Sequence, residues 1–191
     1  SAASSSTSAA RKRLWRLPAS WVLWAAPVIL FAPVWLAGKA LFWGTPALQF
    51  VPWRWIAGEM ISRGELPLWN PWSGMGAPLL ANYQSALLYP PNWLLFVLQG
   101  LGSLLNGSLA PPGFDLSQGL PAWGQTVLVV VHLAWASWGM VRLARRLNLN
   151  PLAQYVSALS YGLSGYMVAR AGFLSINAAA AWMPWSILAA E

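Results

Sequence analysis

Two carboxylates, Glu59 and Glu65, lie in a stretch that is rich in tryptophan, proline and glycine. A carboxylate can act as a general base, or it can hold a divalent cation against a phosphate group. These two side chains are therefore the candidate catalytic residues. The alternative is that each is an ordinary solvated or salt-bridged acid, because Glu59 stands four residues before Arg63 and can pair with it.

Amide and arginine side chains around these acids could bind a sugar or a phosphate. Amides form hydrogen bonds with hydroxyl and phosphate oxygens, and an arginine fork fits a phosphate through two parallel hydrogen bonds. The candidate substrate ligands are Gln49, Arg54, Arg63, Asn70, Gln84, Asn92 and Arg170. The amides could instead cap turns, as Asn70 before Pro71 can, and the arginines could meet ordinary lipid phosphates.

The sequence contains few residues that could bind a metal ion and no motif that is typical of nucleotide binding. The chain has no cysteine, one histidine and four carboxylates, so we expect no protein-only zinc or iron site. A divalent cation shared with a phosphate remains open. The sequence has no glycine-rich nucleotide loop and no nucleophile elbow, which favours a lipid-borne substrate. The one histidine, His132, shares a helical face with Gln125, and we expect a polar seam with one interhelical hydrogen bond.

The overall composition predicts an integral membrane protein. Of the 191 residues, 58% are hydrophobic and only 8% are charged, whereas charged residues make up about a quarter of a soluble domain. The net charge of +7 comes from basic residues that cluster at the ends of apolar runs, within 11–16 and 142–146. This is the pattern of orientation charges, and we expect no nucleic-acid partner.

The apolar runs predict an all-α, polytopic protein with about four transmembrane helices. We expect a disordered basic cytoplasmic tail over 1–16. The run 17–43 is longer than a usual signal-peptide core, so a first span is preferred to a cleaved signal. The expected spans are 17–43, 122–146, 151–169 and 175–190.

Residues 44–121 are expected to form an extracytoplasmic loop with two interfacial helices, at about 52–63 and 86–105. Tryptophans dominate this loop, and amphipathic rings of that kind settle at headgroup depth. In the first helix, Arg54 and Glu59 are expected on the polar face. The second run does not cross the membrane if both clusters of basic residues are cytoplasmic.

The chain begins at Ser1 rather than methionine, and Glu191 directly follows an apolar run. We therefore expect a piece of a longer protein whose remainder is a partner of this part, and we expect this part alone to be inactive.

Several short motifs resemble the first outer loop and later segments of the bacterial YfhO membrane-protein family. They are Gln49, Pro52-Trp53, the run 64–71 (GELPLWNP), 76–78 (GAP), 84–85 (QS), 89–92 (YPPN), 163–167 (LSGYM) and 180–184 (AAWMP). The resemblance covers residues 20–190. That family is similar to the C-type glycosyltransferases, multi-span enzymes whose donor is a sugar on a polyprenyl phosphate.

The resemblance implies a protein of the bacterial cytoplasmic membrane with a cytoplasmic N-terminus. It would transfer a sugar from a polyprenyl-phosphate donor to an extracytoplasmic acceptor, with membrane lipid and that donor as partners. Family members usually carry an acid four positions before the loop glutamine, but Thr45 stands there, and a hydroxyl is no base at neutral pH. Either Glu59 or Glu65 substitutes, or an acid lies beyond residue 191, or the protein is a non-catalytic module for lipid binding, transport or envelope assembly.

Overall fold

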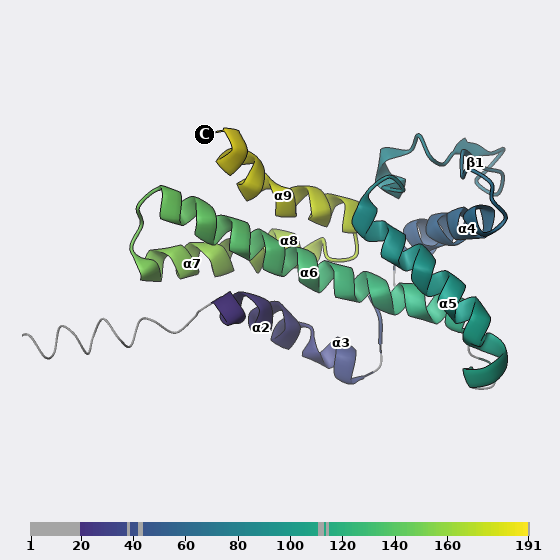
Figure 1. Cartoon of the computed structure of the whole chain (residues 1–191), viewed down its shortest axis with the longest axis horizontal. Helices are drawn as coiled ribbons and strands as arrows, with labels where there is room; N and C mark the ends of the chain where they lie inside the picture. Colours follow the sequence, from purple (N-terminus) through teal and green to yellow (C-terminus); the bar gives the residue numbers. More distant parts are fainter. Residues whose placement is uncertain (1–19, 38, 42–43, 111–112, 114, 191) are drawn as a thin grey trace, which may run out of the picture.

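The computed structural model describes residues 20–37, 39–41, 44–110, 113 and 115–190 and is mostly helical (Figure 1). The helices are α2 (Ser20–Leu30), α3 (Ala32–Leu36), α4 (Val51–Ser62), α5 (Trp93–Leu109), α6 (Leu116–Arg146), α7 (Pro151–Gly162), α8 (Gly165–Ala169) and α9 (Leu174–Ala190). Three short turns, η1 (Pro46–Phe50), η2 (Tyr83–Ser85) and η3 (Pro90–Asn92), accompany a hairpin of β1 (Trp69–Asn70) and β2 (Ala77–Pro78). The predicted all-helical class is confirmed, and the expected tail 1–16 lies outside the described residues.

Helix α6 is the axis of the molecule and packs against α9, α5, α7 and α2 (Figure 1). Its first turn is capped by Asp115, whose carboxylate accepts a hydrogen bond of 2.9 Å from the backbone N–H of Ser117. Arg145 and Arg146 in the last turn complement the helix dipole. Buried leucine, valine and alanine side chains of α6 meet those of α9 and form the main hydrophobic core. The helix that positions the polar groups described below is therefore itself firmly anchored.

Among the described residues, α6 alone is long and apolar enough to cross a membrane. It contains the expected span 122–146, and the helix itself begins earlier, at Leu116, because Asp115 caps it there. The expected span 151–169 is divided into α7 and α8. The break occurs where the side chain of Ser164 accepts a hydrogen bond from the backbone N–H of Met167 and starts a new helix.

Of the other two predicted spans, one is divided in the described chain and the other is a single helix close to its expected bounds. The run 17–43 contains α2 and α3, with a break at Phe31. The run 175–190 is one helix, α9, with Pro184 inside it. Neither α2 nor α9 reaches the length of α6.

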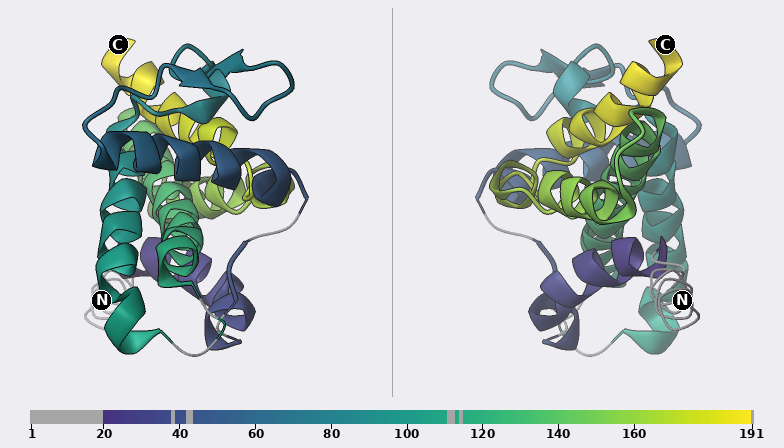
Figure 2. Two further views of the ribbon diagram at one scale, coloured as in Figure 1. Left: turned by 90° about the vertical axis from the view of Figure 1, so that its right-hand side faces the viewer. Right: turned by 90° about the vertical axis from the view of Figure 1, so that its left-hand side faces the viewer.

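Within residues 44–121, the helix expected at 52–63 is present as α4, and the helix expected at 86–105 begins later, at Trp93. The delay has a local cause: the Asn92 side chain donates a 2.8 Å hydrogen bond to the carbonyl of Ala86, which holds residues 86–92 as a compact turn. Helix α4 crosses α5 and α6 rather than running along them (Figure 2). The crossing with α5 is close, since a Cβ atom at Gly58 would overlap the side chain of Gln99.

Candidate functional site

Arg54 is buried, although the sequence pattern places it on the polar face of its helix with Glu59. Its side chain is only 5% exposed. The prediction of an exposed Arg54 is wrong because α4 lies across the bundle and turns the face that carries Arg54, Ala57 and Gly58 inward. A cationic side chain in such a position requires a partner, since an unpaired buried charge is costly.

The structure provides hydrogen-bond partners for only part of the Arg54 guanidinium. The Nη1 group of Arg54 donates a 2.7 Å hydrogen bond to Oε1 of Gln125, which is itself 1% exposed on α6. The Gln125 amide nitrogen in turn donates to the carbonyl of Gly172 at 3.3 Å, so the amide is held from both ends. The Nε and Nη2 atoms of Arg54 are buried and have no partner. The hydrogen-bonding capacity of these two nitrogens is therefore unused within the described structure.

Arg54 is charged at neutral pH in spite of its burial. Desolvation lowers the pKa of Arg54 from its ordinary value to about 10, which is still well above 7. The salt bridge found in the described part of the chain is elsewhere: Arg63 and Glu59 lie 3.4 Å apart on the surface. The buried cation is thus not balanced by a carboxylate of these residues, and an anion would satisfy both its charge and its free donors.

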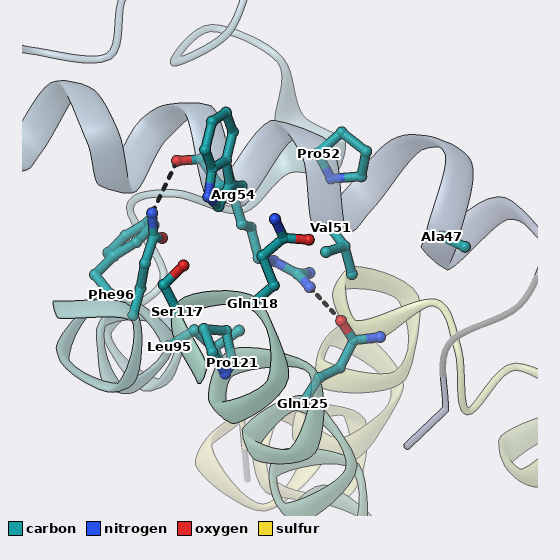
Figure 3. A pocket seen from close by; sticks show the side chains of 12 residues that line it. Ala47, Val51, Pro52, Arg54, Leu95, Phe96, Ser117, Gln118, Pro121 and Gln125 are labelled. Atoms are coloured by element: carbon teal, nitrogen blue, oxygen red, sulfur yellow. Dashed lines mark hydrogen bonds between the residues drawn. The ribbon is translucent and has the colours of Figure 1, made fainter. Parts of the chain in front are cut away.

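Arg54 opens onto a cavity of about 220 Å³, which we call the Arg54 cavity. Figure 3 shows the guanidinium reaching from α4 toward Gln125, and Leu95 and Phe96 of α5 and Pro121 of α6 line the same cavity. Its lining residues are Ala47, Val51, Pro52, Arg54, Trp55, Leu95, Phe96, Gln99, Ser117, Gln118, Pro121 and Gln125. A largely apolar pocket with one cation and a few amides fits an amphipathic ligand with an anionic head.

The two predicted catalytic acids do not reach this cavity. Glu59 faces the surface and is engaged by Arg63, and Glu65 is exposed in the turn after α4. Neither side chain lines the Arg54 cavity. The structure therefore does not bring the acids together with Arg54.

The two predicted asparagine ligands serve the backbone. Asn70 accepts a 3.0 Å hydrogen bond from the N–H of Trp72, and Asn92 holds the turn before α5. Both are buried, at 3% and 1% exposure. These residues follow the structural alternative, in which an amide stabilises a turn.

The remaining predicted ligands lie apart from Arg54. Gln49 and Gln84 approach each other at 3.5 Å, and the exposed Arg170 lies over the ring of Phe173, 5.6 Å from its centroid. No cluster of three or more His, Asp or Glu side chains that could hold a metal occurs within the described ranges. A shared cation would therefore need ligands from its substrate.

A second cavity, of about 1120 Å³, opens between the loop 83–89 and helices α7, α8 and α9. Its aromatic walls are Tyr83, Tyr89, Tyr161, Tyr166 and Trp182, and we call it the tyrosine groove. Behind it lies His132, 3% exposed, whose Nε2 is 2.7 Å from the Tyr89 hydroxyl. Gln125 and His132 are both buried and hydrogen-bonded, but the prediction of an interhelical hydrogen bond for His132 is wrong, because its side-chain partner is a loop tyrosine.

Comparisons with known proteins add no assignment: no protein-family model, curated protein or solved structure matches this chain. Function must therefore be inferred from the two cavities and from the polar groups that line them.

Proposed function

We propose that this chain belongs to an integral membrane glycosyltransferase-like protein that binds a polyprenyl-phosphate sugar and transfers the sugar to an extracytoplasmic acceptor. The proposal rests on one observation, the buried Arg54 with two unpartnered nitrogens in an apolar cavity. A polyprenyl phosphate combines the two chemistries that this cavity offers, because it joins an anionic head to a branched hydrocarbon chain.

The proposed topology places the protein in the bacterial cytoplasmic membrane with α6 as one span. Helices α2–α3, α7–α8 and α9 would serve as three further spans, interrupted or short, with the N-terminus in the cytoplasm. Arg145 and Arg146 at the end of α6 support this orientation, since basic residues favour the cytoplasmic side. Helices α4 and α5 would lie at the outer interface, where exposed rings such as Trp55 and Trp93 support contact with lipid.

In this proposal, the phosphate occupies the space beside Arg54 and accepts hydrogen bonds from Nε and Nη2. Gln125 keeps the guanidinium aimed into the cavity by occupying Nη1. The first isoprene units of the lipid contact apolar side chains such as Leu95 and Phe96. When the bond between the sugar and the phosphate oxygen breaks, the phosphate gains negative charge, and a desolvated arginine stabilises that charge strongly.

A specific observation favours a second candidate, a non-catalytic protein that binds or carries a polyprenyl phosphate. No carboxylate is among the residues that line the Arg54 cavity, and Thr45 stands where the resembling family has an acid. Transfer of a sugar from a polyprenyl-phosphate donor by the purified protein would exclude this candidate. Phosphate-dependent lipid binding without transfer would favour it.

The binding claim itself is tested with farnesyl phosphate, a short polyprenyl monophosphate, and with farnesol, which has the same chain without the charge. We expect the protein in nanodiscs to prefer farnesyl phosphate, and Arg54→Gln to lose at least tenfold in affinity, since hydrogen bonds to charged groups contribute about 1.5–3 kcal/mol. Arg63→Gln, on the surface of the same helix, is the matched control and should bind as the wild type does. Equal affinity for both lipids would contradict the proposal.

A further inference from the structure

The tyrosine groove is chemically unlike the Arg54 cavity, because none of the residues that line it carries a formal charge. Its walls come from several separate segments: Tyr83 from η2, Tyr161 from α7, Tyr166 from α8 and Trp182 from α9. Tyr83 and Tyr166 are 85% and 57% exposed, so their rings are accessible from solvent. The groove therefore offers aromatic faces and hydroxyl groups to a ligand.

The hydrogen-bond directions at Tyr89 are fixed by its surroundings. Nδ1 of His132 lies 2.6 Å from the carbonyl oxygen of Leu128, and because a carbonyl can only accept, Nδ1 carries the proton. In the neutral ring Nε2 is then an acceptor, and the Tyr89 hydroxyl donates to it at 2.7 Å. Trp182 donates its indole N–H to the Tyr89 oxygen at 2.9 Å. The Tyr89 hydroxyl thus donates its proton to His132, and toward the groove its oxygen can only accept a hydrogen bond.

We infer that the tyrosine groove binds a neutral carbohydrate. A sugar ring has C–H faces, which pack against the electron-rich faces of aromatic rings, and a rim of hydroxyl donors. One of these hydroxyls meets the fixed acceptor at Tyr89, and others reach the hydroxyls of Tyr83, Tyr166 and Ser175, for which the described structure provides no hydrogen-bond partner. This inference deepens the proposed function, on which it rests, by giving the sugar or its acceptor a site apart from the phosphate.

Other occupants fit the groove less well. An apolar helix or a lipid chain would cover these phenolic hydroxyls without supplying partners, and each buried unpaired hydroxyl costs free energy. An anion would find no cation among the lining residues. It would also face the lone pairs of Tyr89, whose proton is directed away toward His132.

The residues that support the two cavities lie on the same helix, α6. Gln125, which orients Arg54, and His132, which orients Tyr89, stand seven residues apart on α6, and this separation corresponds to about 10 Å along the helix axis. One rigid helix thus carries the supports of both sites. A phosphate at Arg54 and a sugar in the groove would be held in a fixed relation by α6.

The test uses the protein in nanodiscs, which avoids sugar-based detergents, and neutral trisaccharides of glucose, mannose and N-acetylglucosamine. Binding is measured by saturation-transfer NMR and by calorimetry. We expect at least one trisaccharide to bind, and the double variant Tyr83→Ala/Tyr166→Ala to lose at least tenfold in affinity. Both rings are exposed, so their removal leaves the core intact. Trp72→Ala, which removes an 82% exposed ring outside the groove, is the matched control and should change affinity less than twofold.

Two results would overturn the inference: no binding of any of the three trisaccharides, or binding that the double variant leaves unchanged. Farnesyl phosphate binding is measured on the same samples. If the lipid binds with the Arg54 dependence given above and no trisaccharide binds, the groove inference fails alone. If a trisaccharide binds through the groove while the lipid binds without regard to its phosphate, the lipid-phosphate function fails alone.

Discussion

Helix α6 supports the Arg54 cavity through Gln125 and the tyrosine groove through His132, yet the two sites offer opposite chemistry. The Arg54 cavity is small, about 220 Å³, and contains a buried cation with two unpaired nitrogens. The tyrosine groove is larger, about 1120 Å³, and is lined by neutral aromatic and hydroxyl groups. In the groove the buried polar atoms of Tyr89 and His132 have partners, whereas in the Arg54 cavity the protein leaves part of one side chain unsatisfied.

In the Arg54 cavity an anionic ligand would satisfy the unpaired polar atoms, whereas the tyrosine groove can be filled by water. A buried guanidinium with free donors is destabilising until an anion arrives, so its presence indicates binding rather than stability. Exposed tyrosines cost little when the groove is filled with water. The Arg54 cavity therefore carries the stronger functional claim.

The largest effect is expected from Gln125→Glu, which places a carboxylate against Nη1 of Arg54. The substitution keeps the size of the side chain but supplies an internal anion that competes with the ligand for the guanidinium. We expect farnesyl phosphate affinity to fall by roughly a hundredfold or more, on the scale of a charged hydrogen-bonded pair. Trisaccharide binding in the groove should be unchanged.

The control for this variant is Gln154→Glu on α7, which changes the net charge equally but lies at a half-buried position outside the Arg54 cavity. Isothermal titration of both variants measures the comparison. Full lipid affinity in Gln125→Glu would show that Arg54 does not face the ligand.

A smaller effect is expected from pH. Because burial lowers the pKa of Arg54 to about 10 in the folded protein, the side chain loses its charge as pH rises through 10. Farnesyl phosphate affinity should be constant from about pH 8 to 9, where the phosphate is already doubly ionised, and should fall about tenfold by pH 11. Arg54→Gln should show no such fall in a parallel titration, and a wild-type affinity that holds to pH 11 would argue against a contact with Arg54.

The same pKa difference affects stability in the opposite direction. As pH rises above 10, toward the ordinary pKa of an arginine, the unfolded chain binds more protons at this residue than the folded chain does. The contribution of Arg54 to the free energy of unfolding of the ligand-free protein therefore rises with pH in this window.

The smallest effect is expected on stability at neutral pH. Arg54→Met keeps the aliphatic length but removes a desolvated charge, and we expect the free energy of unfolding without ligand to rise by about 1 kcal/mol. Arg63→Met, at an exposed position of the same helix, should change it by no more than about 0.5 kcal/mol. Denaturant titrations in matched micelles would measure both values. A clear loss of stability in Arg54→Met would instead indicate that the arginine stabilises the fold.

The sequence predicts the helical class and most of the helices, because apolar runs and proline positions act locally. The bounds of the helix at 52–63 could be predicted within one residue, since Pro52 suits a first turn and the helix is amphipathic, with Trp53 and Ile56 on its apolar face. The early start of α6 depends on the single cap at Asp115, and the late start of α5 depends on the side-chain hydrogen bond of Asn92. A hydropathy pattern does not predict side-chain hydrogen bonds of this kind.

The candidate site was predictable only in part. Gln125 and His132 stand out as polar groups in an apolar run, and both are indeed buried and hydrogen-bonded. Arg54 is a ligand candidate in the sequence, but it was expected on the polar face of its helix, and its burial is decided by the crossing of α4 over α6. The hydrogen bond between Trp182 and Tyr89 joins residues 93 positions apart, and no local sequence pattern predicts it.

The most direct measurement is photo-crosslinking with farnesyl phosphate that carries a diazirine on its first isoprene unit, followed by peptide mapping. Labels are expected on α4, α5 and the first turns of α6, near Val51, Phe96 and Pro121, and excess unlabelled farnesyl phosphate but not farnesol should suppress them. Labelling concentrated in the tyrosine groove, or labelling that Arg54→Gln leaves unchanged, would contradict the assignment of Arg54 as the phosphate ligand.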